Sequence, residues 1–173
     1  HRLGGNPRLT MFPQDIKDLA VEVLNAARKA RLTIATAESC TGGLLAGALT
    51  AIPGSSDVFD RGFVTYSNQA KSQMLDVPSG LIDIHGAVSA EVAVWMAEGA
   101  MKASGAGLTV SVTGIAGPGG GSASKPVGLV HFAVGFQCRQ ALTREMRFGD
   151  IGRDSVRLAS VRVALEMLIE AMG

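Results

Sequence analysis

The stretch that decides the fold is Leu32-Thr33-Ile34-Ala35-Thr36-Ala37-Glu38-Ser39-Cys40-Thr41-Gly42-Gly43. Its first half, from Leu32 to Ala37, is a short β-rich run that predicts a strand. The run breaks at Glu38, and a segment of small residues that predicts a helix follows Gly43 to about Ile52. A strand that passes directly into a helix is typical of α/β proteins.

The rest of the chain continues this alternation. Further strands are predicted at 59–66, 108–112, 128–136 and 139–148, and helices at 13–31, 89–104 and 153–172, with a short helix capped by Asn68 and a loop around 78–80. Helical connections make the first three strands parallel, and the tight turn between the last two adds an antiparallel strand. The predicted fold class is therefore α/β, with a mixed, mostly parallel five-stranded sheet that helices cover on both faces.

The start of the chain differs from the remainder. Residues 1–10 carry no periodic apolar pattern, and Met11 follows them. We interpret 1–10 as a tag or disordered leader and 11–173 as one domain.

Composition excludes several classes of protein. With 47% hydrophobic and 18% charged residues, the chain is too apolar to be disordered. A net charge of +1 argues against electrostatic binding of nucleic acid, and no apolar run approaches the roughly 20 residues of a membrane span. Cys40 and Cys138 are too few for a disulfide framework or a metal site. We therefore expect a cytoplasmic, reduced protein that contacts neither nucleic acid nor membrane.

Polar residues follow the first three predicted strands, at Glu38-Ser39, Tyr66-Ser67-Asn68 and Thr113-Gly114. Parallel strands point their carboxyl ends to one edge of a sheet, where α/β proteins bind ligands. These residues should therefore converge.

Ser39 lies between a predicted strand and a predicted helix. The backbone N–H groups of Thr41, Gly42 and Gly43, at the start of that helix, should be unsatisfied and point toward Ser39. Such a place can activate a nucleophile, supply an oxyanion hole or hold a phosphate. The alternative is an ordinary helix N-cap.

Lys71 follows Tyr66 by five residues, on the first turn of the next helix. A cation is disfavoured near a helix N-terminus, and partial burial would lower the lysine pKa further and suit it to take a proton from a serine. A solvated surface lysine is the alternative. Tyr66, the only tyrosine, is equally suited to be a core aromatic with its hydroxyl at the rim.

Cys40 is the rival nucleophile. A thiolate needs a cationic partner, and neither His85, in a predicted loop, nor His131, in a predicted strand, lies in a Cys–His signature. No Gly-x-Ser-x-Gly elbow occurs, and no cluster has metal-ligand spacing. We therefore expect Cys40 to pack as a small buried residue.

The glycine-rich run from Gly114 to Gly121 could cradle an anionic or planar ligand, although it lacks the Walker pattern. It belongs to a stretch, Gly99 to Arg144, that contains no Asp or Glu. Arg153 and Arg157, one turn apart, are candidate phosphate ligands, or else part of a solvated helix face.

Four motifs occur together in order: Ala37–Gly43, Thr65–Asn68 with Lys71, Val112–Pro118 and Lys125–Gly128. In this combination the chain resembles the C-terminal domain of the competence/damage-inducible protein A family, whose stand-alone members are nicotinamide-nucleotide amidases. The resemblance covers residues 13–172 and implies a three-layer α/β/α sandwich with a five-stranded mixed sheet.

The resemblance also implies an activity: hydrolysis of nicotinamide mononucleotide to nicotinate mononucleotide and ammonia, without metal or cofactor. It implies Ser39 as nucleophile, Lys71 as general base and Tyr66 as a neighbour that relays a proton or orients the lysine. The substrate-binding residues that we expect are Thr41, Gly42, Gly43, Asn68, Thr113, Gly114, Gly117 and Arg153.

Other classes of function stay open. A module that binds a pyridine nucleotide without turnover would show saturable binding and release no ammonia. A protein that interacts with partners in competence or in the response to DNA damage is a second alternative, suggested only by the family's name. An amidase that acts on a different small amide is a third. The apolar helices permit a homodimer, which we favour, without requiring one.

Overall fold

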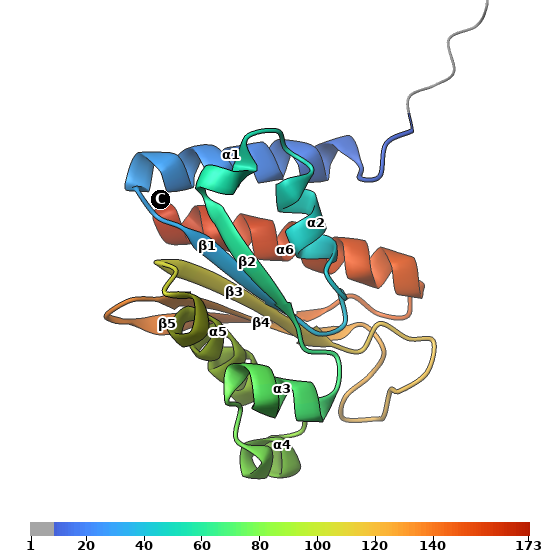
Figure 1. Ribbon diagram of the computed structural model, residues 1–173. Coiled ribbons are helices and arrows are strands. Elements are labelled where there is room, and N and C mark those ends of the chain that lie inside the picture. Colours follow the sequence, from blue (N-terminus) through green and yellow to red (C-terminus); the bar gives the residue numbers. More distant parts are fainter. Residues whose placement is uncertain (1–8) are drawn as a thin grey trace, which may run out of the picture.

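A mixed sheet of five strands forms the middle layer of the molecule (Figure 1). The computed structural model describes residues 9–173, so most of the predicted leader lies outside the described residues. The strands are β1 (Ile34–Glu38), β2 (Phe59–Val64), β3 (Leu108–Gly114), β4 (Leu129–Phe136) and β5 (Arg139–Arg147), in the order β2-β1-β3-β4-β5. β1 pairs in parallel with β2 and β3, whereas β4 is antiparallel to β3 and to β5. The predicted parallel start and antiparallel end are confirmed.

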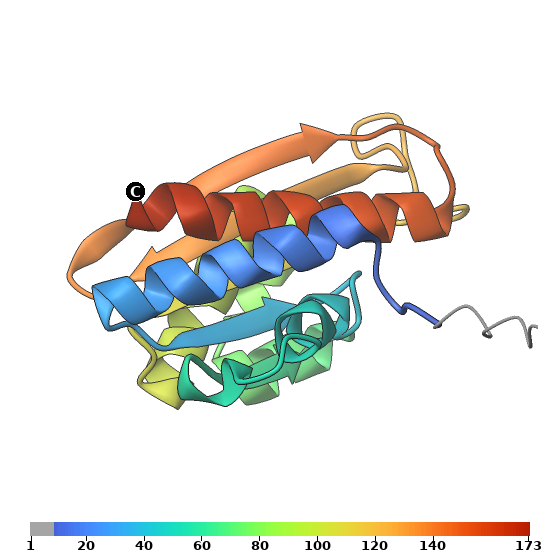
Figure 2. The ribbon, with the colours of Figure 1, turned by 90° about the horizontal axis from the view of Figure 1, so that it is seen from above.

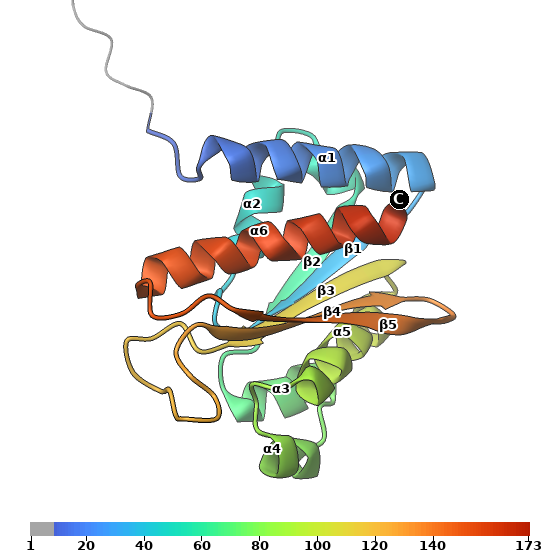
Figure 3. The same ribbon diagram turned by 180° about the vertical axis from the view of Figure 1, so that it is seen from behind.

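Helices cover both faces of this sheet, so the predicted three-layer sandwich is confirmed (Figures 1 and 3). One layer holds α1 (Gln14–Ala30), α2 (Leu44–Thr50) and α6 (Arg153–Met172). The other holds α3 (Asn68–Leu75), α4 (Ser79–His85) and α5 (Ala90–Ser104). A short 3₁₀ helix, η1 (Ser55–Asp57), precedes β2. No described helix is long and apolar enough to cross a membrane.

The central strands explain why both faces need a helical layer. Every residue of β1 is buried, as is all of β3 except Gly114. In β3, Leu108, Val110 and Val112 belong to the large core shared with α1 and α6. The alternate side chains face the other layer, where Thr109 Oγ1 and Ser111 Oγ donate to the α5 carbonyls of Ala97 and Ala93. These bonds satisfy hydroxyls that would otherwise be costly to bury.

α1 and α6 lie side by side over one face and run in the same direction (Figure 2). Ile16, Val23 and Leu24 of α1 recur at helical spacing on one face and are fully buried. An ion pair between Arg162 of α6 and Asp15 of α1 joins the two helices on their exposed side.

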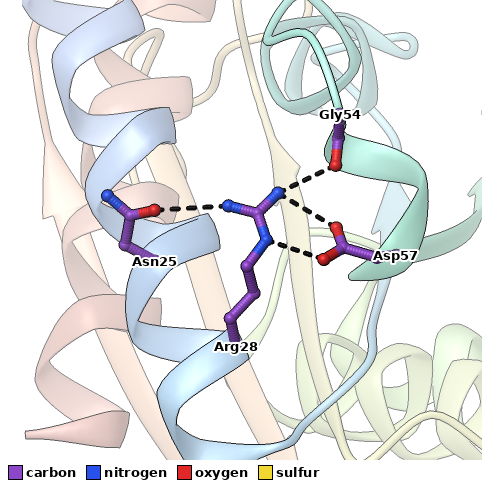
Figure 4. Close-up of polar contacts among 4 residues, drawn as sticks. All are labelled: Asn25, Arg28, Gly54 and Asp57. Atoms are coloured by element: carbon purple, nitrogen blue, oxygen red, sulfur yellow. Dashed lines mark hydrogen bonds and ion pairs between the residues drawn. The ribbon is translucent and has the colours of Figure 1, made fainter.

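Arg28, near the end of α1, holds the segment that leads into β2 (Figure 4). Its Nε and Nη2 donate to the Asp57 carboxylate at 2.7 and 3.0 Å, and Nη2 also donates to the Gly54 carbonyl at 2.8 Å. This hydrogen bonding lowers the pKa of Asp57. The contacts fix the entry to β2, whose far end carries part of the site.

Several predicted boundaries were wrong. α2 begins after Gly43 as predicted but ends at Thr50, two residues before Ile52, and β2 ends at Val64, two residues before Tyr66. The predicted loop at 78–80 instead begins α4, whose last residue is His85. Ser67, not Asn68, caps α3, because its hydroxyl accepts the Ala70 N–H at 3.0 Å.

Candidate active site

A pocket of about 270 Å³ opens where β1, β2 and β3 end. Predicted site residues that line it are Ser39, Tyr66, Asn68, Lys71, Thr113, Gly114, Gly117 and Arg153. The other lining residues are Cys40, Ala87, Val88, Ile115, Ala116, Gly119 and Gly120. The expected convergence of the three strand ends is confirmed.

The centre of the pocket is a contact between Lys71 and Ser39. Lys71 Nζ lies 2.9 Å from Ser39 Oγ and 2.8 Å from the carbonyl oxygen of Thr65, with the Tyr66 carbonyl at 3.4 Å. Three acceptors around one nitrogen fix its position. A hydroxyl and an amine at this distance can exchange a proton directly.

Burial prepares this lysine for proton transfer. Only 1% of Lys71 is exposed, so the alternative of a solvated surface lysine is wrong. Burial lowers its pKa to about 8, because the ammonium form loses hydration. The lysine therefore loses its proton far more readily than one in water.

Ser39 stands at the end of β1 and is not the cap of α2. Its backbone N–H donates to the carbonyl of Val112 on β3 at 2.9 Å. The N-cap of α2 is Gly43, at φ 101°, four residues later. The N-cap alternative for Ser39 is therefore wrong, and its hydroxyl is left facing Lys71.

The amides that follow Ser39 are arranged differently from our expectation. Thr41, Gly42 and Gly43 do not line the pocket, and the Gly42 N–H donates to the Ser39 carbonyl at 3.0 Å. Among residues 9–173, the N–H groups of Cys40, Thr41 and Gly43 have no backbone acceptor. Of these three residues only Cys40 lines the pocket.

Glu38 was expected at this edge of the sheet, but its role there was not predicted from the sequence. Its buried carboxylate accepts the Thr41 hydroxyl at 2.6 Å and the N–H groups of Leu45 and Ala46 at 2.8 and 3.1 Å. It thus satisfies the first amides of α2, which keeps these donors from a ligand. The available signal was an acidic residue just before a helix N-terminus, where negative charge is favoured.

Tyr66 and Arg153 meet at the mouth of the pocket. Tyr66 is 62% exposed, so it is not a core aromatic, and its hydroxyl accepts a bond from Arg153 Nη2 at 3.0 Å. Arg153 Nη1 also donates to the Gly117 carbonyl at 2.8 Å. The arginine therefore joins the segment after β2 to the glycine-rich loop.

The glycine-rich loop needs its glycines for close approach. A Cβ on Gly114 would lie 2.6 Å from Val130 Cγ2, and one on Gly117, at φ 80°, 2.5 Å from Val127 Cγ1. Thr113 is buried, and its hydroxyl donates to the Ala87 carbonyl at 2.9 Å. The loop is thus held tightly against the end of the sheet.

Cys40 is a poor rival to Ser39. Burial raises the pKa of its thiol to about 12, so no useful fraction is thiolate at neutral pH. His85 and His131 lie outside the pocket, each within 4 Å of a glutamate. In the described part of the chain no cluster of three His, Cys, Asp or Glu could hold a metal ion.

The charged groups that line the pocket are Lys71 and Arg153, with no carboxylate among the described lining residues. The site therefore favours an anionic ligand beside a buried serine and lysine.

Comparison with known proteins identifies the family of this chain. The family model described as CinA C-terminal domain matches residues 16–172. The chain belongs to the CinA C-terminal domain family. The CinA domain of this chain is similar in structure to the competence/damage inducible protein CihA from Agrobacterium tumefaciens, with 56% identity, a TM-score of 0.91, and 94% of this chain and 98% of that one covered.

Sequence relatives of this CinA domain have two lengths. A CinA-like protein from Synechococcus is 52% identical over 96% of this chain, but the match covers 39% of that relative. The chain therefore spans about two fifths of such relatives. The nicotinamide-nucleotide amidohydrolase PncC from Escherichia coli is 48% identical, and the match covers 91% of this chain and 95% of PncC.

Proposed function

We propose that this chain is an amidohydrolase that converts nicotinamide mononucleotide to nicotinate mononucleotide and ammonia. The observation that carries the proposal is the buried Lys71 Nζ, 2.9 Å from Ser39 Oγ. The substrate is suggested by the name of PncC, which matches over nearly its whole length.

The reaction begins with the neutral form of Lys71. Its lone pair accepts the proton of Ser39 Oγ while the oxygen attacks the carboxamide carbon. The lowered pKa, about 8, leaves a useful fraction of neutral lysine near neutral pH. The carbonyl of Thr65, 2.8 Å from Nζ, holds the amine in place and accepts a hydrogen bond from it.

The tetrahedral intermediate carries a negative oxygen that needs donors. The Cys40 N–H is our candidate, because it has no backbone acceptor among residues 9–173 and its residue lines the pocket. One such donor is worth roughly 3–4 kcal/mol in the transition state. Protonated Lys71 then passes its proton to the leaving nitrogen, and ammonia departs.

The acyl-enzyme is resolved by water. Neutral Lys71 accepts a proton from the water that attacks the Ser39 ester, and the lysine returns that proton to Ser39 Oγ as nicotinate mononucleotide leaves. We assign both proton transfers to Lys71 rather than to Tyr66, since Lys71 Nζ lies 2.9 Å from Ser39 Oγ, whereas the Tyr66 hydroxyl contacts Arg153 at the mouth of the pocket.

The phosphate of the substrate is assigned to the mouth of the pocket. Arg153 supplies a guanidinium, and the N–H groups of Gly117 and Gly119 have no acceptor within the described residues. Asn68 and Thr113 line the remaining wall. We keep Thr41, Gly42 and Gly43 as support for Ser39 rather than as contacts to substrate.

The proposal includes the setting of the enzyme. We place it in the cytoplasm, since Cys40 and Cys138 are free thiols, and expect no nucleic-acid partner at a net charge of +1. We favour a homodimer, for which the exposed apolar Ile84 and Trp95 offer a surface. Light scattering tests the assembly.

The function is tested by ammonia release from nicotinamide mononucleotide, with nicotinamide riboside as the unphosphorylated control. We expect turnover of the mononucleotide at much lower concentration than of the riboside. Saturable binding of the mononucleotide with no ammonia would identify a binding module and overturn the proposal.

A further inference from the structure

Arg157 contacts the turn that follows the candidate nucleophile. It lies on α6, one helical turn after Arg153, and is half-buried. Its Nε donates to the Cys40 carbonyl at 3.1 Å and its Nη2 to the Thr41 carbonyl at 3.3 Å. The two arginines therefore differ: Arg153 lines the pocket, whereas Arg157 does not.

With the contacts of Arg157, each backbone carbonyl from Ser39 to Thr41 accepts a hydrogen bond. The Ser39 carbonyl accepts the Gly42 N–H, and the Thr41 carbonyl accepts the Leu44 N–H. The Cys40 carbonyl lies between them, and Arg157 is its one donor among the described residues. Without the Arg157 guanidinium, the Cys40 carbonyl would have no hydrogen-bond donor among residues 9–173.

The fit around Arg157 is close. Gly42 adopts φ 56°, and a Cβ there would lie 3.2 Å from Arg157 Nη2, so a side chain at this position would press on the guanidinium. A peptide group is planar, with its C=O and N–H pointing in opposite directions. By holding the Cys40 carbonyl, Arg157 fixes the Cys40–Thr41 peptide group. This peptide follows the Ser39–Cys40 peptide, which carries the Cys40 N–H, so Arg157 limits rotation of the backbone at Cys40.

We propose that Arg157 is a positioning residue for the Ser39 nucleophile: it holds the Cys40 and Thr41 carbonyls so that Ser39 Oγ and the Cys40 N–H keep their places in the pocket. The catalytic part of this inference rests on the proposed amidase function. A misplacement of about 1 Å can cost on the order of 100-fold in rate. The loss should therefore fall on kcat.

The kinetic test compares Arg157→Ala with Arg162→Ala, a matched control because Arg162 lies on the same helix and pairs with Asp15 away from the pocket. For Arg157→Ala we expect kcat to fall roughly 10- to 100-fold with KM nearly unchanged. The loss should be equal on the mononucleotide and the riboside, and millimolar guanidinium should restore part of it. A loss confined to KM for the mononucleotide would instead make Arg157 a phosphate ligand and overturn the proposal.

A second measurement needs no substrate. In a Cys138→Ser background, Cys40 is the remaining thiol, and it is buried in the turn that Arg157 holds. We expect Arg157→Ala to increase the rate of Cys40 labelling by N-ethylmaleimide at least fivefold, and Arg162→Ala to leave it unchanged. An unchanged rate in Arg157→Ala would overturn the proposal, even if the wild-type chain released no ammonia and the proposed function had failed.

Discussion

Lys71 Nζ and Ser39 Oγ lie 2.9 Å apart although 32 residues separate them in the chain. Ser39 follows β1, and Lys71 lies on α3, the helix that follows the neighbouring parallel strand β2. The sheet order therefore builds the pair. Burial of Lys71 then lowers its pKa to about 8, which suits it to the role of base that we propose.

The pH dependence of turnover follows from the lowered pKa of Lys71. Because only the neutral amine can accept the Ser39 proton, kcat/KM for ammonia release should rise with pH and level off above about 8. Below that pH it should fall about tenfold per unit. A rate profile from pH 6 to 9.5 measures this, and a flat profile across pH 7 to 9 would contradict the role of Lys71.

The same lysine should affect stability in a defined pH window. Its pKa is about 8 in the folded protein and near 10.5 when unfolded, so between these values only the unfolded chain binds the proton. The free energy of unfolding should therefore gain about 3 kcal/mol from Lys71 between pH 8 and 10.5.

Lys71→Met removes this contribution and leaves other titrating groups in place. The stability of the wild type minus that of the variant, from urea unfolding, should rise by about 3 kcal/mol over this range. A difference that stays constant with pH would show that Lys71 is not perturbed by burial.

Sequence patterns predicted the strands and the convergence at their ends because both depend on local periodicity and on strand direction. Ser39 was found in this way, whereas Lys71 and Arg153 were named from their positions on the predicted helices; all three line the pocket. The contacts of Glu38 and Arg157 were not predicted, because both depend on tertiary packing. The Glu38 carboxylate accepts N–H groups at the start of α2, and the Arg157 guanidinium binds a carbonyl 117 residues away in the chain.

Arg153 should distinguish phosphorylated from unphosphorylated substrate. Removing one charged hydrogen-bonding partner costs roughly 1.5–3 kcal/mol, so Arg153→Ala should raise KM for the mononucleotide about 10- to 100-fold. KM for the riboside should change little. Equal effects on the two substrates would place the phosphate elsewhere. Tyr66→Phe, which removes only the hydroxyl bonded to Arg153, should have a smaller effect.

Glu38 should matter for stability more than its position on a strand suggests. Glu38→Ala leaves the Thr41 hydroxyl and the amides of Leu45 and Ala46 without their acceptor. The free energy of unfolding should fall by about 2 kcal/mol, and less in Glu38→Gln, which keeps one acceptor oxygen. Glu166→Ala, at an exposed position of α6, is the control. Equal stability of the three variants would contradict the capping role.

The central claim, that Ser39 is the nucleophile, is tested most directly by ammonia release from saturating nicotinamide mononucleotide in Ser39→Ala. The variant should keep the wild-type circular dichroism spectrum and unfolding midpoint, because it removes only one oxygen. We predict a loss of at least about 1,000-fold in kcat, as for other nucleophile deletions. Turnover within tenfold of the wild type would contradict the account.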